Sequence, residues 1–344
     1  MIKPLSVKPL VKQDLEHVLN YARQDLECLR GARLFVTGGT GFFGKWLVSS
    51  FIEANRALGL RATMVLLTRD PKRFSQENAD LVADSSVSLC RGDVRSFDFP
   101  AGEFTHSIQG ASGPGNQPLG MFDTIAEGTR RVLKCAAQSG AKRFLFLSSG
   151  AVYGSQPAAM THIPETYGGG PDPLLPGSEY GEAKRAAEHF CGLLSQLNGF
   201  EATIARCFAF YGPHLPLNAN FAIGNFMSDA LAKRPIGIQG DGTTYRSYLY
   251  AADLAIWLWA LLIRGKSNRA YNVGSDEELT IAALAQAVAE EASSQEGIQI
   301  AQQPKPGAAP LRYVPSIERA RTELGLEVRI KLHEGIRRTL EWLR

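Results

Sequence analysis

The sequence lacks the patterns that mark disulfide-rich proteins and metalloproteins. Its five cysteines are scattered, with no C-x-x-C pair, and its six histidines show no H-x-x-x-H spacing. An odd, dispersed set of cysteines is typical of a reducing compartment, so we expect a cytoplasmic protein. Without a ligand spacing of the usual kind, we expect no metal centre.

Long apolar runs and an excess of one charge are also missing. The most apolar stretch, Leu254–Ile263, has ten residues, about half of what a membrane span needs, and predicts a buried helix. The N-terminus has no apolar run of the signal-peptide kind. The 37 basic and 34 acidic residues are nearly balanced, and neither a basic block nor an acidic tail is present, so we expect no nucleic-acid or membrane partner.

What the sequence does contain is an alternation of short apolar strands with helices. Strands are expected at residues 33–37, 62–67, 87–90, 104–108, 143–147 and 202–206, and helices at 45–54, 122–138 and 180–197. This alternation predicts an α/β fold, a Rossmann-type doubly wound parallel sheet with helices on both faces.

The 344 residues are enough for two domains. We expect an N-terminal helical extension over residues 1–30, because residues 11–29 have the apolar periodicity of an amphipathic helix. The dinucleotide-binding domain should cover residues 31–206, with 246–275 returning to it. A smaller substrate-binding lobe should comprise residues 207–245 and 276–344, where Pro and Gly become more frequent.

A glycine-rich stretch, TGGTGFFG at residues 37–44, lies between the first strand and the first helix of this alternation. Gly38, Gly41 and Gly44 have G-x-x-G-x-x-G spacing. Glycines at such a turn let backbone N–H groups approach a pyrophosphate, and the following helix N-terminus favours the anion. The strand–turn–helix context predicts a dinucleotide site.

The end of the second strand bears on the choice of cofactor. Thr68 stands where a ribose-binding carboxylate is usual, and Arg69 follows it. Because a guanidinium suits a 2′-phosphate, this favours NADP(H), while Asp70 leaves NAD(H) open. Asp93, in RGDV after the third strand, could accept from the adenine amino group.

A tyrosine and a lysine four residues apart, Tyr180 and Lys184, are predicted on one helical face. The lysine ammonium would stabilise a tyrosine phenolate, which could then take a hydroxyl proton as hydride leaves the same carbon. The stretch SSGAVYG follows a strand at the carboxyl edge of the sheet, where ligands bind, so a serine hydroxyl there could contact the reacting oxygen.

Together TGGTGFFG, RGDV, SSGAVYG, YGEAK and GDGTTYRSYLYAADLA resemble the extended short-chain dehydrogenase/reductase family, in its nucleotide-sugar epimerase/dehydratase branch. The resemblance implies that Ser149, Tyr180 and Lys184 are catalytic. It implies a nucleoside-diphosphate sugar as substrate and a homodimer formed by the helices near 122–138 and 180–197. The residues expected to bind the cofactor are Gly38, Thr40, Gly41, Phe42, Phe43, Gly44, Arg69, Asp93, Val94, Tyr180 and Lys184. Those expected to bind the substrate are Ser149, Tyr180, Asn220, Arg246 and Arg312.

One departure from the family pattern guides the expected reaction. The family's 4,6-dehydratases carry Asp-Glu directly after the catalytic hydroxyl residue, and its uronate decarboxylases keep the Glu. Here these positions are Gly150 and Ala151, which transfer no protons. The hypothesis from the sequence is therefore an epimerase, acting at C4 through a transient keto sugar, with dehydratase and decarboxylase disfavoured.

Two alternatives stay open at this point. An NADPH-dependent reductase of a nucleotide-linked 4-keto-6-deoxysugar would use the same three residues. A dinucleotide-sensing regulatory protein without catalysis would need none of them together.

Overall fold

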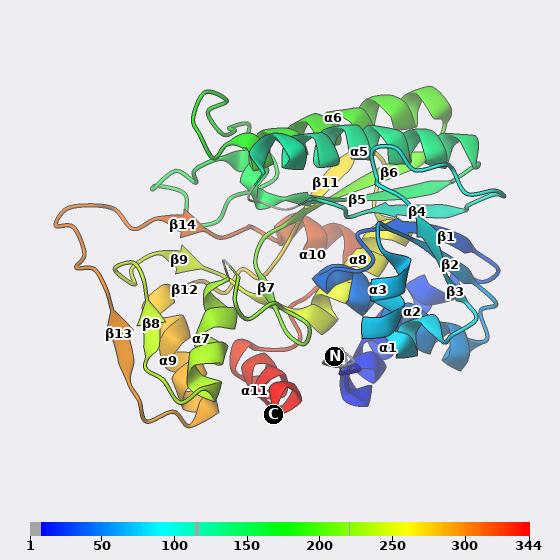
Figure 1. The fold of residues 1–344 in the computed structure, drawn as a ribbon. Helices are drawn as coiled ribbons and strands as arrows, with labels where there is room; N and C mark the ends of the chain where they lie inside the picture. Colours follow the sequence, from blue (N-terminus) through cyan, green and yellow to red (C-terminus); the bar gives the residue numbers. More distant parts are fainter. Residues whose placement is uncertain (1–7, 114–116, 220) are drawn as a thin grey trace. The chain divides into compact units, whose positions relative to one another are not determined.

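The computed structural model describes residues 8–113, 117–219 and 221–344 (Figure 1). The described chain divides into two compact units. Unit 1 comprises residues up to 154 together with 169–206 and 255–271, and unit 2 comprises 155–168, 207–254 and 272–344.

Unit 1 is built on a seven-stranded sheet in the order β11-β6-β5-β4-β1-β2-β3. The neighbours from β3 to β5 in this order pair in parallel. The order is that of a doubly wound Rossmann-type fold, as expected. The strands are β1 (Arg33–Thr37), β2 (Thr63–Thr68), β3 (Val87–Arg91), β4 (His106–Gln109), β5 (Arg143–Ser149), β6 (Glu201–Cys207) and β11 (Arg269–Val273).

Helices cover both faces of this sheet, because its central strands are apolar on both sides (Figure 1). On one face α5 (Pro118–Gln138) packs along α6 (Glu179–Asn198). On the other lie α2 (Phe42–Leu58) and α8 (Ala251–Arg264), joined by the hydrogen bond from Trp259 Nε1 to Ser50 Oγ at 2.9 Å. The most apolar stretch of the chain is thus a buried helix, as predicted.

The amphipathic N-terminal segment forms α1 (Lys12–Glu27) within unit 1. It packs on α2, burying Val18 and Leu26. Asp25 binds Arg264 of α8 through two hydrogen bonds, of 2.6 Å and 3.1 Å. The helix is therefore held by its own unit through both apolar and ionic contacts.

Three local features differ from the expected pattern. Short helices α3 (Pro71–Glu77) and α4 (Ala79–Val82) follow β2, where no helix was expected. Strand β5 runs two residues beyond 147, so that Ser149 is its last residue. A 3₁₀ helix, η1 (Gly150–Tyr153), follows at once.

Unit 2 is made of small sheets and helices. Its strands are β7 (Phe210–Tyr211), β8 (Ile236–Ile238), β9 (Tyr245–Arg246), β10 (Leu249–Tyr250), β12 (Leu279–Thr280), β13 (Ile298–Ile300) and β14 (Arg312–Tyr313). Its helices are α7 (Ala222–Leu231), α9 (Ile281–Ala292), α10 (Glu318–Leu324) and α11 (Leu332–Leu343). β9 is central in the three-stranded sheet β12-β9-β14.

The boundaries of the units differ from those expected at three places. Residues 155–168, 246–254 and 272–275 belong to unit 2 rather than to the dinucleotide-binding domain. The first segment is tied to unit 2 because Glu165 accepts from the Asn272 amide at 2.9 Å and Ile163 forms a β-bridge with Pro315. Such pairings link residues about 100 or more positions apart in the sequence.

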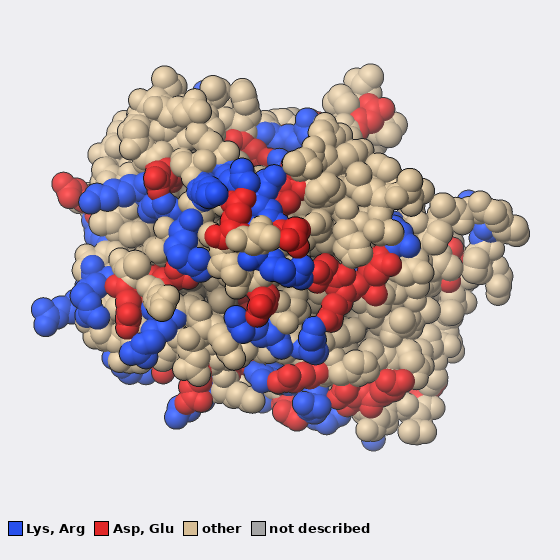
Figure 2. Space-filling model, turned by 180° about the vertical axis from the view of Figure 1, so that it is seen from behind, with Lys and Arg blue, Asp and Glu red and all other residues tan. Residues whose placement is uncertain are grey.

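The charged side chains on the face drawn in Figure 2 are mixed, with Lys and Arg interspersed among Asp and Glu. This agrees with the formal net charge of +3. Among the described residues, the helices include none that is long and apolar enough to cross a membrane.

Candidate active site

A cavity of about 560 Å³ lies at the carboxyl ends of β1 to β4 in unit 1. Ligands bind at this edge in open α/β sheets. The cavity is lined by Thr37, Gly38, Thr40, Gly41, Leu67, Thr68, Arg69, Asp70, Arg73, Phe74, Glu77, Gly92, Asp93, Val94, Gly110, Ala111, Ser112, Gly113 and Thr124. Six residues expected to bind the cofactor are in this lining: Gly38, Thr40, Gly41, Arg69, Asp93 and Val94.

We call the glycine-rich stretch at residues 37–44 the cradle. Two of its glycines, Gly38 and Gly44, stand where a side chain would collide with neighbouring backbone atoms. Gly38 has φ +72°, and a Cβ there would lie 2.5 Å from the carbonyl carbon of Gly110. A Cβ on Gly44 would lie 2.3 Å from the carbonyl carbon of Gly39. The turn is therefore closed tightly onto the start of α2, whose N-cap is Gly41. This backbone fits a dinucleotide pyrophosphate.

Five residues expected at the cofactor are not part of that lining: Phe42, Phe43, Gly44, Tyr180 and Lys184. Phe42 and Phe43 begin α2 and contact each other edge-on, with ring centroids 5.7 Å apart. Gly44 is buried within the same helix. Their contribution is to the shape of the turn, because the part of the glycine-rich stretch that lines the cavity, Thr37 to Gly41, comes before α2.

The cavity wall after β2 and β3 carries charges of both signs. Arg69 is exposed and lines it. Asp70 caps α3, accepting from the Arg73 amide at 3.0 Å. Asp93 accepts from Arg95 Nε at 2.8 Å and from its amide at 2.9 Å. The side-chain bond from Arg95 lowers the pKa of Asp93, so this carboxylate stays ionised at neutral pH.

The cavity has further walls that the sequence reasoning missed. Gly110, Ala111, Ser112 and Gly113 follow β4, and Thr124 belongs to α5. The signal that could have found the first four is their position directly after a strand at the same sheet edge. The strand itself was expected to end one residue earlier, at 108, because its apolar pattern is short.

Ser149, Tyr180 and Lys184 all belong to unit 1 and lie outside the lining of the cavity. Ser149 ends β5, and its Oγ accepts from the Ala151 amide at 3.2 Å. Lys184 is buried in α6 and donates from Nζ to the Leu147 carbonyl at 2.6 Å. Its Nζ lies 5.7 Å from the centroid of the Tyr180 ring. The helix pair predicted by the four-residue spacing is thus formed.

Helix α6 and η1 approach each other closely next to Tyr180 and Ser149. A Cβ on Gly181 would lie 2.6 Å from the Ala151 carbonyl oxygen. Gly181 directly follows Tyr180, and Ala151 comes two residues after Ser149. The start of α6 is therefore packed against the turn that carries the serine, which the absence of a side chain at 181 permits.

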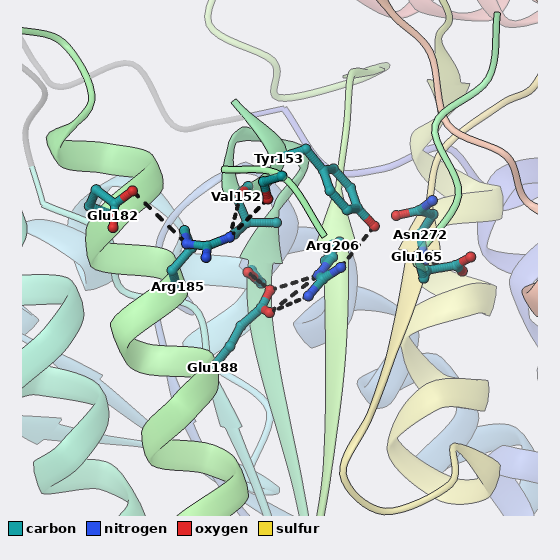
Figure 3. A network of polar contacts seen from close by, with 10 residues as sticks. Val152, Tyr153, Glu165, Glu182, Arg185, Glu188, Arg206 and Asn272 are labelled. Carbon is teal, nitrogen blue, oxygen red and sulfur yellow. Dashed lines mark hydrogen bonds and ion pairs between the residues drawn. The ribbon is translucent and has the colours of Figure 1, made fainter. Parts of the chain in front are cut away.

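A partly buried polar network lies beside this turn and was not predicted (Figure 3). Glu188 of α6 binds Arg206 of β6, with the shortest contact at 2.7 Å. Ser148 donates to Glu188 at 2.6 Å, and Arg206 donates to the Tyr153 hydroxyl at 3.0 Å. Glu188 follows Lys184 by four residues, so its place on the same helical face could have been inferred.

In unit 2 the structure brings Arg246 and Arg312 onto neighbouring strands, because β14 pairs with β9. The Arg246 guanidinium lies 5.2 Å from the centroid of the Tyr313 ring. The Arg312 guanidinium lies 4.1 Å from that of Tyr245 and forms an ion pair with Glu278. Asn220, also expected to bind substrate, lies outside the described residues.

Comparison with known proteins identifies the family. Residues 34–274 match the model of the NAD dependent epimerase/dehydratase family. The chain belongs to this family. The resemblance inferred from the sequence motifs is thereby confirmed.

Among curated relatives, the chain is 31% identical to UDP-glucuronic acid decarboxylase 1 of Arabidopsis thaliana, over 89% of this chain and 68% of that protein. Among solved structures, it is 26% identical to a UDP-glucose 4-epimerase of Thermus thermophilus in complex with NAD, with TM-score 0.72 over 90% of this chain and 98% of that one. A dTDP-glucose 4,6-dehydratase from Bacillus anthracis in complex with NAD is similar in fold, at 18% identity and TM-score 0.74 over 91% of this chain and 96% of that one.

These comparisons correct the expected reaction. The sequence reasoning predicted an epimerase or a reductase and disfavoured dehydratases and decarboxylases. UDP-glucuronic acid decarboxylases from Danio rerio and Xenopus tropicalis, each 28% identical over nine-tenths of the chain, join the Arabidopsis protein among its relatives. The prediction was therefore wrong. It relied on two missing proton-transfer groups, at Gly150 and Ala151, although the similarity to decarboxylases extends along nine-tenths of the chain.

Proposed function

We propose that the protein oxidises the C4 hydroxyl of a nucleoside-diphosphate uronic acid, with a nicotinamide cofactor, and releases the carboxyl group as CO₂. The observation that carries the proposal is the similarity to UDP-glucuronic acid decarboxylases along nine-tenths of the chain. The arrangement of Ser149, Tyr180 and Lys184 in the same unit as the dinucleotide cradle supports it. A bound nicotinamide ring supplies the hydride acceptor for this chemistry.

In the first step, Tyr180 accepts the proton of the C4 hydroxyl as that carbon is oxidised to a ketone. Lys184 is fixed by the Leu147 carbonyl, with its ammonium near the Tyr180 ring, and so stabilises the phenolate. Ser149 donates a hydrogen bond to the reacting oxygen.

In the second step, the new C4 ketone makes the C6 carboxylate a β-keto acid. The C5–C6 bond breaks, its electron pair enters the C4–C5 enolate, and CO₂ leaves. The hydroxyls of Ser149 and Tyr180 stabilise the negative charge on the C4 oxygen. C5 then takes up a proton from water. Tyr180 returns its proton to the C4 oxygen as the ketone is reduced again, so that the cycle is redox-neutral.

Decarboxylation by this route does not need a proton-transfer group at Gly150 or Ala151. Loss of water needs a base at C5 and an acid at the C6 oxygen, whereas loss of CO₂ from a β-keto acid needs only a place for the electron pair. A carboxylate at position 151 is therefore dispensable for the bond that breaks. The proton for C5 comes from water, because Tyr180 must return the proton that it holds to the C4 oxygen.

The test is to incubate the purified protein with UDP-glucuronic acid labelled at C6 and with NAD⁺ or NADP⁺. We expect labelled CO₂ and a UDP-pentose by mass spectrometry. UDP-glucose, which has no carboxylate, is the matched control and should release no CO₂. Turnover of UDP-glucose with no binding of UDP-glucuronic acid would overturn the proposal.

For the cofactor we propose a preference for NADP(H) over NAD(H). The support is Arg69, which lines the cavity directly after Thr68 ends β2. No carboxylate stands at the strand end itself, and Asp70 is engaged in capping α3. Titration of the protein with each cofactor should give the lower Kd for NADP⁺.

For the substrate we propose that Arg246 binds the diphosphate, since a guanidinium matches phosphate oxygens. Arg312 on the neighbouring strand β14 is the second candidate. Its ion pair with Glu278 already occupies part of the guanidinium and weakens its attraction for a phosphate. Arg246→Met should raise KM for the nucleotide sugar without changing Kd for the cofactor. Asn220 stays a prediction from the sequence.

For the assembly we propose a homodimer formed by α5 and α6. Exposed leucines on these helices support the proposal, since Leu193 and Leu197 of α6 and Leu119 of α5 are exposed. Sedimentation equilibrium should give twice the chain mass, and a concentration-independent monomer would contradict it.

A further inference from the structure

We propose that Glu188 and Arg206 are positioning residues, which hold the turn carrying Ser149 in register with Tyr180 and Lys184. The inference rests on the proposed function for its catalytic consequence. Its structural part, that the pair orders the turn, can be measured without any substrate.

The first argument is the set of elements that the pair connects (Figure 3). Glu188 is on α6, the helix of Tyr180 and Lys184, and Arg206 is on β6. Glu188 accepts from the Ser148 hydroxyl at 2.6 Å, and Ser148 directly precedes Ser149. The carboxylate thus ties the catalytic helix to the end of the catalytic strand.

The second argument is that Arg206 holds the other end of the same turn. Its Nη1 donates to the Tyr153 hydroxyl at 3.0 Å, and its guanidinium lies 4.8 Å from the centroid of that ring. Tyr153 is the last residue of η1, which starts directly after Ser149. The short segment from Ser148 to Tyr153 is therefore anchored at both ends to one ion pair.

A third contact from α6 supports the middle of the segment. Arg185 Nη1 donates to the Val152 carbonyl at 3.1 Å and to the Gly169 carbonyl at 3.1 Å. Arg185, unlike Arg206, is 43% exposed. The backbone of η1 is thus held from the surface side as well. We call the contacts of Glu188, Arg206 and Arg185 with the segment from Ser148 to Tyr153 the clamp, of which the ion pair is the less exposed part.

The low exposure of the pair indicates that it mainly fixes the position of the turn, rather than raising the stability of the fold. The side chains of Arg206 and Glu188 are only 17% and 11% exposed. Burial of two charges costs free energy that their attraction often fails to recover, so a buried ion pair is weak evidence of stabilisation. Burial alone would lower the pKa of Arg206, but the hydrogen bonds and charge of Glu188 raise it, and the guanidinium stays charged.

The chain offers a matched control at the other end of the same two strands. Arg143 begins β5 and forms an ion pair with Glu201, which begins β6. Glu201 is 55% exposed, and the contacts of this pair lie away from the turn that carries Ser149. A substitution there perturbs a charge pair between β5 and β6 without touching the proposed clamp.

The experiment compares Glu188→Gln, Tyr153→Phe and Ser148→Ala with Glu201→Gln. Hydrogen exchange followed by mass spectrometry measures the peptide over residues 148–154. We expect faster exchange in the first three variants and wild-type exchange in Glu201→Gln. Unchanged exchange in all three would overturn the proposal, whatever the enzyme's substrate.

The second measurement is the rate of cofactor reduction on mixing with a nucleotide sugar, which precedes any release of CO₂. We expect the rate to fall about 100-fold in Glu188→Gln and about tenfold in Tyr153→Phe, with KM nearly unchanged, because misplacement of about 1 Å has effects of this size. Glu201→Gln should keep the wild-type rate. Faster exchange with unchanged rates in folded variants would overturn the catalytic part of the proposal.

The two proposals fail separately in this design. If a nucleotide sugar reduces the cofactor without loss of CO₂, the proposed decarboxylation is wrong, but the rates still test the clamp. If Glu188→Gln does not fold, Tyr153→Phe and Ser148→Ala still test it, because both keep the ion pair intact.

Discussion

At the carboxyl end of β5 and β6 the glutamate of the pair Arg206–Glu188 is 11% exposed, whereas at the amino end of the same strands the glutamate of Arg143–Glu201 is 55% exposed. Glu188 of the first pair accepts a hydrogen bond from Ser148, and Arg206 donates one to the Tyr153 hydroxyl, on either side of Ser149. At the exposed end, Arg143 also donates to the carbonyls of Leu262 and Gly265. The same residue types thus contact the turn around Ser149 at one end and tie the chain together at the other.

Glycines differ between the two ends in the same way. Gly44 at the carboxyl end has backbone atoms 2.3 Å from where a Cβ would lie. Gly140, in the loop before β5, has φ +72° but nothing within 4 Å of that position. Backbone atoms are closely packed around the glycine at the carboxyl end, whereas at the amino end the glycine only lets the chain turn. Four predictions test this contrast.

The largest effect is expected from Tyr180→Phe at the carboxyl end. Removal of one proton-transfer group should lower kcat about 1,000-fold while leaving Kd for the cofactor unchanged. Tyr21→Phe, the same substitution at an exposed position of α1, is the control and should keep full turnover. Steady-state kinetics with UDP-glucuronic acid measures both, and equal rates for the two variants would remove Tyr180 from the mechanism.

The second prediction concerns His106, at the amino end of β4. Burial, and then the charges of Arg143 and Lys142, lower its pKa from 6.5 to about 4. Between these values the unfolded chain binds a proton that the folded chain does not, so stability falls as the pH drops from 6.5 towards 4. The loss should reach about 3 kcal/mol.

Urea unfolding at pH 7.5 and pH 4.5 measures this loss in wild type and in His106→Gln. The variant should lose less stability between the two pH values, and its turnover at pH 7.5 should match that of wild type. An equal loss in both proteins would contradict the assignment to His106.

The third prediction compares Gly44→Ala with Gly140→Ala. The first forces the cradle apart, and an overpacking cost of about 1–3 kcal/mol corresponds to a rise in Kd for the cofactor of about 100-fold at its upper end. The second places alanine in the left-handed region and should lower stability by about 1 kcal/mol with Kd unchanged. Calorimetric titration and thermal unfolding separate the two effects; a normal Kd in Gly44→Ala would show that the cradle is not the cofactor site.

The smallest effect is expected from Arg69→Ala, again against an amino-end control. Loss of one exposed guanidinium should weaken NADP⁺ about tenfold and leave NAD⁺ binding unchanged. Arg30→Ala, whose side chain donates to the carbonyls of Leu58 and Gly59, should change neither. A parallel loss of affinity for both cofactors in Arg69→Ala would argue against recognition of a 2′-phosphate.

Much of the fold could be predicted because its signals are local. The strand at 33–37 was placed at its observed bounds, and the helix with Tyr180 and Lys184 within one residue. The short helices after β2 were missed because Pro71 and the mixed charges there are equally typical of a loop. The reaction was mispredicted because the absence of carboxylates at 150 and 151 excludes proton transfer by them, not the loss of CO₂.

The sequence by itself determined the class of the fold, the glycine cradle and the pairing of Tyr180 with Lys184, since these depend on repeats of two and 3.6 residues and on short spacings. Only the tertiary structure decided that Arg206 would lie beside Glu188, or that Arg312 would lie on the strand next to Arg246. Such contacts join residues that no short spacing relates. They follow from the order in which strands pair, which the packing of the whole sheet selects and no local pattern encodes.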